Sequence, residues 1–393
     1  MRATGIVVEY NPFHNGHKLH LMEAKKSGDL VIAVMSGNFL QRGEPAIYDK
    51  WTRARMALKN GVDLVVELPV FYSAQSAEIF SHGAVDILDK LGAETLVFGS
   101  ESSDLEKLKK IAYLQIDEKK LVDEKIKERM EEGVSYPNAI NSVIEELLGE
   151  KGILKPNDIL GVEYIKAIRK LGSSMEPTLI ERKAVGYHDK EIIDEITSAT
   201  SIREMIKEGR VEEIKRVMPA ESFEILGTPT YLEKFYPLLR YEILNNYEEL
   251  KFIADMEIGL DNRVFEMAVK YPDFHEFYKN LMTKRYTNGR IQRVLAHILL
   301  KIDKKIIDET KAGTTYVKIL GFSQAGSRYL KEKKENLRIK PLSGLKNVSL
   351  ILDERERELL NFEIKCDRIY GIVSPYEERK FPIIMKSELM DKN

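Results

Sequence analysis

Residues 5 to 20 contain the feature that most restricts the fold, an apolar strand that leads through a turn into a helix. The strand pattern from Gly5 to Val8 is interrupted by Asn11-Pro12. A helical pattern begins at about Asn15 and places apolar side chains on its inner side, namely Leu19, Leu21, Met22 and Ala24. This strand, turn and helix unit predicts that the chain begins with the first βα turn of a Rossmann-like sheet.

The turn carries two histidines around a glycine, His14-Asn15-Gly16-His17. A helix start presents unpaired N–H groups and the positive end of the helix dipole, which together attract phosphate. Both imidazoles can donate hydrogen bonds to phosphoryl oxygens, and Gly16 leaves room for a base or a ribose. The motif therefore indicates catalysis on a nucleotide. A helix cap or a surface pair without a ligand is the alternative.

Strand and helix patterns alternate after this unit. The patterns are a continuous apolar strand from Asp29 to Gly37, a helix from Trp51 to Asn60, a strand from Asp63 to Leu68, a helix from Ala77 to Leu91 and a strand from Glu94 to Phe98. Helical segments over 104–150 and 157–171 precede a further strand from Pro177 to Lys183. This alternation predicts an α/β fold with a parallel, doubly wound sheet.

The pattern changes at about residue 210 to successive amphipathic helices, for example over Tyr231 to Asn245, Asn262 to Tyr271 and Ile291 to Lys301. Short strands are predicted at Tyr316 to Leu320 and Val348 to Leu352, with a turn over 321–326 and a loosely held tail in the last ~20 residues. We expect a catalytic nucleotide-binding domain over 1–208 and a mainly helical domain over 209–393.

Composition limits the partners and the compartment. The 61 basic and 63 acidic residues nearly cancel, so RNA binding would depend on local basic patches. Cys366 is the only cysteine, which excludes an intramolecular disulfide and a cysteine-based zinc site and suits a reducing cytoplasm. No signal-like segment begins the chain and no run approaches the ~20 apolar residues of a membrane span, so we expect a soluble cytoplasmic protein.

A second group of candidate residues lies at a predicted helix start, Thr197 to Arg203. Ser201 and Glu204 have the spacing of a capping box, and Arg203 adds a cation near the free N–H groups. These residues suit phosphate binding, although a serine-rich cap without a ligand has the same pattern. Gly99 ends a predicted strand where a doubly wound sheet opens to its ligand, so it suits either an adenosine contact or an ordinary turn.

The stretch Lys284 to Arg293 carries four cations and a tyrosine. Such a stretch can bind an RNA backbone and stack a base, and a solvated helix start is the alternative. The loop cation Arg42 and Lys50 at a helix start could neutralise a triphosphate or hold a carboxylate. We expect His188 to have a structural rather than a catalytic role. No metal site made of protein ligands is evident.

Asn11 to His17 resembles the HxGH signature of the HIGH-type nucleotidyltransferases, which activate substrates by attack on the α-phosphate of ATP. Glu9-Tyr10-Asn11 departs from the usual Gly-Thr-Phe-Asp that leads into this signature. Together with Gly37 to Pro45, the stretch from Val8 to His17 resembles the bacterial tRNA(Met) cytidine acetate ligases. Thr197 to Arg203 resembles the Ser-Ser-Thr-x-Ile-Arg motif of the superfamily, with Ala199 in place of one serine.

This resemblance implies an ATP-dependent ligase. Acetate would attack ATP to give acetyl-adenylate and pyrophosphate, and the acetyl group would pass to N4 of the wobble cytidine, C34, of elongator tRNA(Met). Magnesium would arrive with ATP. The alternatives are a nucleotidyltransferase or acyl-adenylate ligase with a small-molecule substrate, and a nucleotide sensor without catalysis.

The same resemblance, taken with the patterns above, gives the candidate residues. The catalytic residues would be His14 and His17. The ATP-binding residues would be Val7, Val8, Glu9, Tyr10, Asn11, Pro12, Phe13, His14, Asn15, Gly16, His17, Lys18, Leu19, His20, Gly99, Asn157, Arg182, Ser198, Thr200, Ser201 and Arg203. The tRNA-binding residues would be Lys284, Arg285, Arg290 and Arg293.

Overall fold

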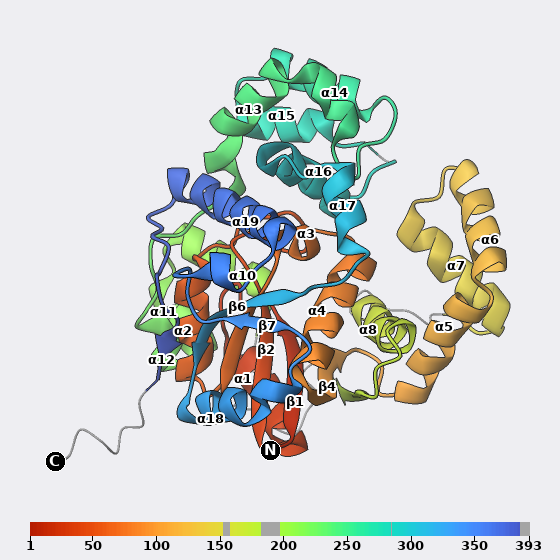
Figure 1. Ribbon diagram of the computed structural model, residues 1–393. Coiled ribbons are helices and arrows are strands. Elements are labelled where there is room, and N and C mark those ends of the chain that lie inside the picture. The colour runs from red at the N-terminus through yellow and green to blue at the C-terminus, as the bar shows by residue number, and fades with distance from the viewer. Residues whose placement is uncertain (152–157, 182–196, 284, 386–393) are drawn as a thin grey trace.

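The computed structural model describes residues 1–151, 158–181, 197–283 and 285–385 (Figure 1). An eight-stranded sheet lies at its centre, in the order β5-β4-β1-β2-β3-β6-β7, with β8 paired to β6. The strands are β1 (Ala3–Val8), β2 (Leu30–Ser36), β3 (Leu64–Leu68), β4 (Ala93–Ser100), β5 (Glu176–Glu181), β6 (Tyr316–Phe322), β7 (Lys340–Leu342) and β8 (Ile383–Ile384). β1 to β5 are parallel, whereas β6 runs antiparallel to β3.

Helices cover the sheet and extend beyond it (Figure 1). The helices of the first half are α1 (Asn15–Ala24), α2 (Lys50–Lys59), α3 (Val70–Ser73), α4 (Ala77–Leu91), α5 (Leu105–Asp117), α6 (Lys119–Glu131), α7 (Tyr136–Leu148) and α8 (Asp158–Lys170). Those that follow are α10 (Ala199–Glu208), α11 (Val211–Val217), α12 (Ala220–Phe223), α13 (Tyr236–Asn245), α14 (Leu260–Lys270), α15 (Phe274–Leu281), α16 (Asn288–Leu300), α17 (Lys304–Thr310), α18 (Gln324–Lys333) and α19 (Glu354–Val373). No described helix combines the length and apolarity needed to cross a membrane.

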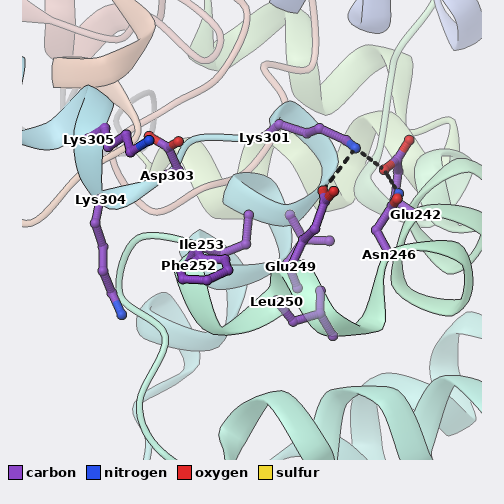
Figure 2. A pocket seen from close by; sticks show the side chains of 11 residues that line it. Glu242, Asn246, Glu249, Leu250, Phe252, Ile253, Lys301, Asp303, Lys304 and Lys305 are labelled. Carbon is purple, nitrogen blue, oxygen red and sulfur yellow. Dashed lines mark hydrogen bonds and ion pairs between the residues drawn. The ribbon is translucent and has the colours of Figure 1, made fainter.

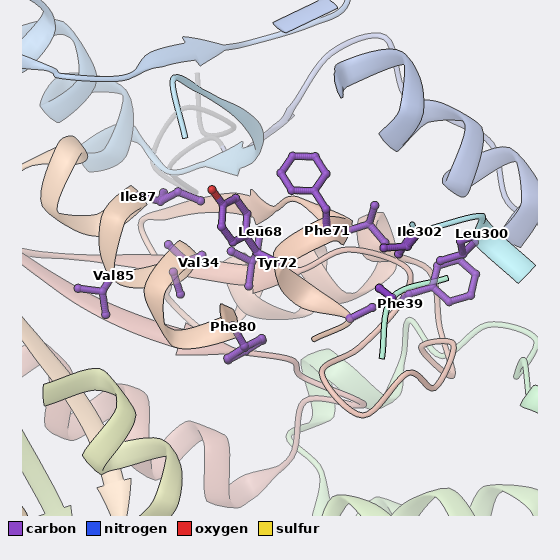
Figure 3. Close-up of a cluster of buried hydrophobic side chains, with 14 of the residues drawn as sticks. Val34, Phe39, Leu68, Phe71, Tyr72, Phe80, Val85, Ile87, Leu300 and Ile302 are labelled. Carbon is purple, nitrogen blue, oxygen red and sulfur yellow. The ribbon is translucent and has the colours of Figure 1, made fainter. Parts of the chain in front are cut away.

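The buried sheet separates two apolar clusters. Side chains alternate along β2, so Ile32 and Val34 enter one cluster while Ala33 and Met35 enter the other. A strand buried on both faces reads as a continuous apolar run, which is the pattern that predicted it. The first cluster continues past Phe39 to Leu300, as Figure 3 shows, so the sheet and α16 share a core.

The predicted α/β fold is confirmed: the parallel strands β1 to β5 and the helices between them follow the predicted alternation. The predicted strand at 348–352 is wrong, because Val348–Leu350 forms a 3₁₀ turn. Short apolar runs cannot be assigned by periodicity alone. The predicted turn at 321–326 begins inside β6, and Ile383–Ile384 of the predicted tail pairs with β6. The division at residue 208 stays a prediction, and the sheet draws strands from both sides of it.

Candidate active site

The strand order places the N-terminal motif where the sheet opens. β1 lies between β4 and β2, and the chain continues to β2 on one side while β4 pairs on the other. Ligands of doubly wound sheets bind beyond the carboxyl ends of the strands at such a switch point. The loop after Val8 and the end of β4 at Gly99 and Ser100 both lie at this edge.

The two histidines cap α1 reciprocally. His14 is the N-cap, and its Nδ1 accepts a hydrogen bond from the Gly16 backbone N–H at 3.1 Å. His17 Nδ1 accepts from the His14 backbone N–H at 3.3 Å, and the ring centroids lie 3.7 Å apart. A neutral imidazole that accepts at Nδ1 carries its hydrogen on Nε2. Backbone contacts therefore assign Nε2 as the donor nitrogen of both rings.

Tyr10 and Phe13 support His17 from behind. Both are fully buried, and the Tyr10 ring meets the Phe13 and His17 rings at centroid distances of 4.6 and 5.0 Å. Tyr10 adopts a φ of 49°, which is uncommon for a residue other than glycine. Burial raises the pKa of the Tyr10 hydroxyl well above its usual range. These two aromatic side chains therefore pack against the His17 ring.

The buried Arg53 links the backbone just after β1 to the backbone at the end of β2. Arg53 Nη1 donates to the carbonyl oxygens of Glu9 at 2.6 Å and Ser36 at 3.0 Å, and Nη2 donates to that of Gly37. Glu9 Oε1 accepts from the Gln41 backbone N–H at 2.8 Å, and burial raises the pKa of the Glu9 carboxyl. The Gln41 loop is thereby attached to the turn after β1.

The second predicted group, Thr197 to Arg203, contacts the loop of the first motif through Arg203. Ser198, rather than Ser201, is the N-cap of α10, and its Oγ accepts from the Ser201 N–H at 3.1 Å, so the predicted Ser201–Glu204 capping box is wrong. Each of several hydroxyl residues could cap this helix, and the sequence did not distinguish them. Arg203 donates to Asn11 O at 3.1 Å and to Thr200 Oγ1 at 3.2 Å. The two helix starts and one guanidinium therefore converge on the same loop.

These groups suit a phosphorylated ligand. Helix N-termini and arginine bind phosphate, and imidazole N–H groups can stabilise charge that develops on a phosphoryl group. A family model described as HIGH Nucleotidyl Transferase matches residues 1–381. The chain belongs to this family.

Relatives of HIGH nucleotidyl transferase type match nearly the whole chain. The tRNA(Met) cytidine acetate ligase of Fusobacterium nucleatum is 42% identical and covers 98% of this chain and 99% of its own length. That of Bacillus subtilis is 39% identical and covers 96% of this chain and 93% of its own length. The crystal structure of Thermotoga maritima TmcAL bound with alpha-thio ATP is 33% identical and superposes with a TM-score of 0.90, covering 98% of this chain and 100% of that chain.

The remaining residues of the first motif differ in exposure. His14 to Lys18 and His20 are half-buried and Leu19 is exposed, whereas Val8 and Asn11 to Phe13 are buried and Val7 is half-buried. His20 Nε2 lies 3.3 Å from the Val97 carbonyl oxygen, which ties α1 to β4. Gly99 is half-buried at the end of β4. Asn157, Arg182, His188 and Lys284 lie outside the described residues.

The predicted tRNA-binding cations are engaged in ion pairs. Arg285 and Arg290 contact Glu257 at 3.0 and 2.7 Å, and Arg293 contacts Asp255 at 2.9 Å. The Arg285 side chain remains 72% exposed, whereas that of Arg293 is 16% exposed. Among these three, Arg285 is the cation best placed to meet a polyanion.

Lys50 is not a surface cation. Its side chain is fully buried, and Nζ lies 3.0 Å from Glu67, 2.5 Å from Asp367 and 3.3 Å from Glu378. Lys318 joins the same cluster through Glu67 at 3.0 Å and Glu363 at 3.4 Å. Sequence reasoning did not find this cluster or the Arg53 contacts, because the partners come from separate elements. Lys50 therefore holds α19 to the sheet, while Arg42 is exposed.

Two hollows lie among the helices and loops of the described chain. One of about 430 Å³ is lined only by residues between 242 and 305 (Figure 2), where Lys301 contacts Glu242 at 3.2 Å and Glu249 at 3.6 Å. The other, of about 210 Å³, is lined by Arg203 and by residues of the 44–47 loop and of the segments 230–233 and 274–292. The smaller hollow shares Arg203 with the candidate site.

Proposed function

We propose that this chain is an ATP-dependent tRNA(Met) cytidine acetate ligase. It activates acetate as acetyl-adenylate and transfers the acetyl group to N4 of the wobble cytidine of elongator tRNA(Met). The reciprocal cap of His14 and His17 at α1 carries the proposal, because it orients two Nε2 donors at a helix start. Curated relatives of this name that match nearly the full length support the choice of substrates.

The first step makes acetate reactive. A carboxylate acylates poorly because its leaving group would be an oxide, whereas an adenylate leaves as AMP. An acetate oxygen attacks the α-phosphorus and pyrophosphate departs with the electron pair of the broken P–O bond. Negative charge develops on the α-phosphoryl oxygens, where the His14 and His17 Nε2–H groups act as fixed donors. This route requires no covalent enzyme intermediate.

Phosphate binding uses the two helix starts. The positive end of the α1 dipole and the Ser198, Thr200 and Ser201 hydroxyls at the start of α10 face the triphosphate, and Arg203 neutralises it. Among the described residues, no group of three acidic, cysteine or histidine side chains is arranged to hold a metal. In this proposal magnesium arrives with ATP and is held mainly by its phosphates and water.

The second step requires an RNA amine. The cytosine amino group leaves the anticodon stack, which a single-stranded loop base does at low cost. It attacks the acetyl carbonyl carbon and AMP departs. Arg285, just before α16, and Arg290 and Arg293, in its first two turns, contact the RNA backbone in this proposal.

Product analysis tests the proposal. Purified protein is incubated with ATP, labelled acetate and elongator tRNA(Met), and nucleosides are analysed by mass spectrometry. We expect N4-acetylcytidine at the wobble position only when all three substrates are present. Without tRNA, labelled acetyl-adenylate is the only labelled product expected. Transfer of the label from it to a small-molecule acceptor would instead indicate a small-molecule ligase, and ATP binding without pyrophosphate release would indicate a sensor.

A further inference from the structure

The 210 Å³ hollow lies between the candidate nucleotide site and the helices that follow it. Its lining includes Glu44, Arg203, Tyr231, Phe274, Tyr278 and Gln292. Pockets for drug-sized ligands are larger, about 300–1,000 Å³. This hollow therefore suits one ring rather than a whole nucleotide.

Hydrogen bonds tie the hollow to the motif loop. Arg203 lines it while donating to Asn11 O at 3.1 Å. The opposite wall is attached through Thr230, whose N–H donates to Ile47 O at 2.8 Å, and Ile47 N–H donates to Asn11 Oδ1 at 2.7 Å. A ring in the hollow would lie beside the loop that precedes His14.

Two buried polar atoms in its lining lack partners. Gln292 is 9% exposed and its Nε2 donates to Glu44 Oε1 at 3.0 Å, yet its Oε1 has no hydrogen-bond partner in the described part of the chain. The buried Tyr231 hydroxyl lacks a partner in the same described ranges. Both residues therefore bring polar groups to the walls of the hollow.

The chemistry of the walls matches a cytosine ring. Phe274 and Tyr278 lie on one helix face with ring centroids 5.5 Å apart, and aromatic walls stack a base. The Glu44 carboxylate and the Gln292 carbonyl are acceptors, and a carboxylate recognises the cytosine amino group by accepting its hydrogen. The larger hollow of Figure 2 shares no lining residue with the motif loop.

We infer that this hollow receives the acceptor cytosine and that Glu44 takes the proton that its amino group releases. The inference rests on the proposed function. The N4 lone pair forms a bond to the acetyl carbonyl carbon, and the bond from that carbon to the phosphate oxygen breaks with its electrons on AMP. One N4 proton passes to Glu44 and then to water. Gln292 orients the carboxylate and accepts from the same amino group.

Glu44→Gln tests this role because it keeps the shape of the side chain. Glu44 also pairs with Arg203 at 3.7 Å, and the glutamine amide keeps an oxygen for that contact. Acetate-dependent pyrophosphate exchange, which reports adenylate formation, should therefore stay at the wild-type rate. Single-turnover acetyl transfer to tRNA should fall by about 100-fold or more, the usual contribution of a general base, with tRNA affinity unchanged. Glu44→Asp should recover part of the rate. Normal transfer in Glu44→Gln would overturn the inference, whereas absence of exchange in the wild type would overturn the proposed function.

Glu249→Gln, which changes a carboxylate of the larger hollow, is the matched control and should transfer the acetyl group to tRNA at the wild-type rate. If Glu249→Gln loses transfer while Glu44→Gln keeps it, the base lies in the larger hollow and the inference is overturned. A second readout does not depend on catalysis. An anticodon stem-loop with 4-thiouridine at the wobble position is irradiated on the enzyme. We expect cross-linked peptides from 229–233 or 274–292, and cross-links confined to other segments would overturn the inference.

Discussion

His14 and His17 accept backbone hydrogen bonds through the same ring atom, Nδ1, and their centroids are 3.7 Å apart. The pair is a capping box in which imidazoles replace the usual hydroxyl and carboxamide. Each ring is thus oriented by the backbone that it caps. Structural and catalytic roles of these side chains can be separated, because capping uses Nδ1 and the proposed catalysis uses Nε2.

We predict that His14→Asn and His17→Gln abolish catalysis while preserving stability. Both amides supply a carbonyl acceptor for the cap, but their NH2 groups do not occupy the position of the imidazole Nε2–H. Acetate-dependent pyrophosphate exchange should fall by about 100-fold or more, the loss typical of one missing transition-state donor. Thermal unfolding should stay close to wild type. His82→Asn on α4 is the histidine control, and exchange at the wild-type rate in both motif variants would exclude the catalytic assignment.

The first βα unit was predictable because its signals are local. Apolar residues indicated β1, and Asn11-Pro12 indicated the turn before α1. The predicted inner side of α1 is wrong for Leu19 and Met22, which are exposed, and correct for Leu21 and Ala24. Lys50 was not predictable, because a lysine that follows Asp49 at a helix start looks like a solvated residue. Its partner Asp367 is 317 positions away in sequence. Arg53 and Arg55 likewise share one sequence context, yet only the former is fully buried.

We predict that Gly43→Ala destabilises the protein more than Gly209→Ala. Both glycines have positive φ, 81° and 72°, so both alanine variants carry a left-handed backbone cost of about 1–2 kcal/mol. A Cβ on Gly43 would also lie 2.5 Å from the Arg293 Cα, whereas nothing lies within 4 Å at Gly209. Denaturant unfolding measures the difference. Equal losses would show that α16 need not approach the loop so closely.

We predict that the free energy of unfolding depends on pH through Glu363. Burial raises the pKa of this carboxyl from an ordinary value of 4.5 to about 7, with Lys318 opposing the shift. Because the folded state retains a proton that the unfolded state releases, this contribution is complete below about pH 4.5 and is lost as the pH rises through 7. As the pH rises, the free energy of unfolding of Glu363→Gln should fall by up to about 3 kcal/mol less than that of the wild type.

Unfolding free energies at several pH values between 4.5 and 8 measure the Glu363 effect. Wild type should lose stability relative to Glu363→Gln as the pH rises across this range. Glu358→Gln, which removes an exposed carboxylate from the same helix, should follow the wild-type curve. A constant difference between wild type and Glu363→Gln at every pH would show that the carboxyl does not titrate in this range.

We predict that substitution of Arg285 weakens the salt dependence of tRNA binding. Its side chain is 72% exposed and pairs with Glu257 at 3.0 Å, so RNA phosphate can compete for it. Each phosphate contact to single-stranded RNA contributes about 0.7 to the slope of log affinity against log salt, because binding releases a counterion. Arg285→Gln should lower that slope by about this amount while adenylate formation is unaffected. Lys119→Gln, whose side chain is 66% exposed and paired with Asp123, is the control. If both variants keep the wild-type slope, the RNA backbone contacts other cations and the tRNA-binding assignment of Arg285 fails.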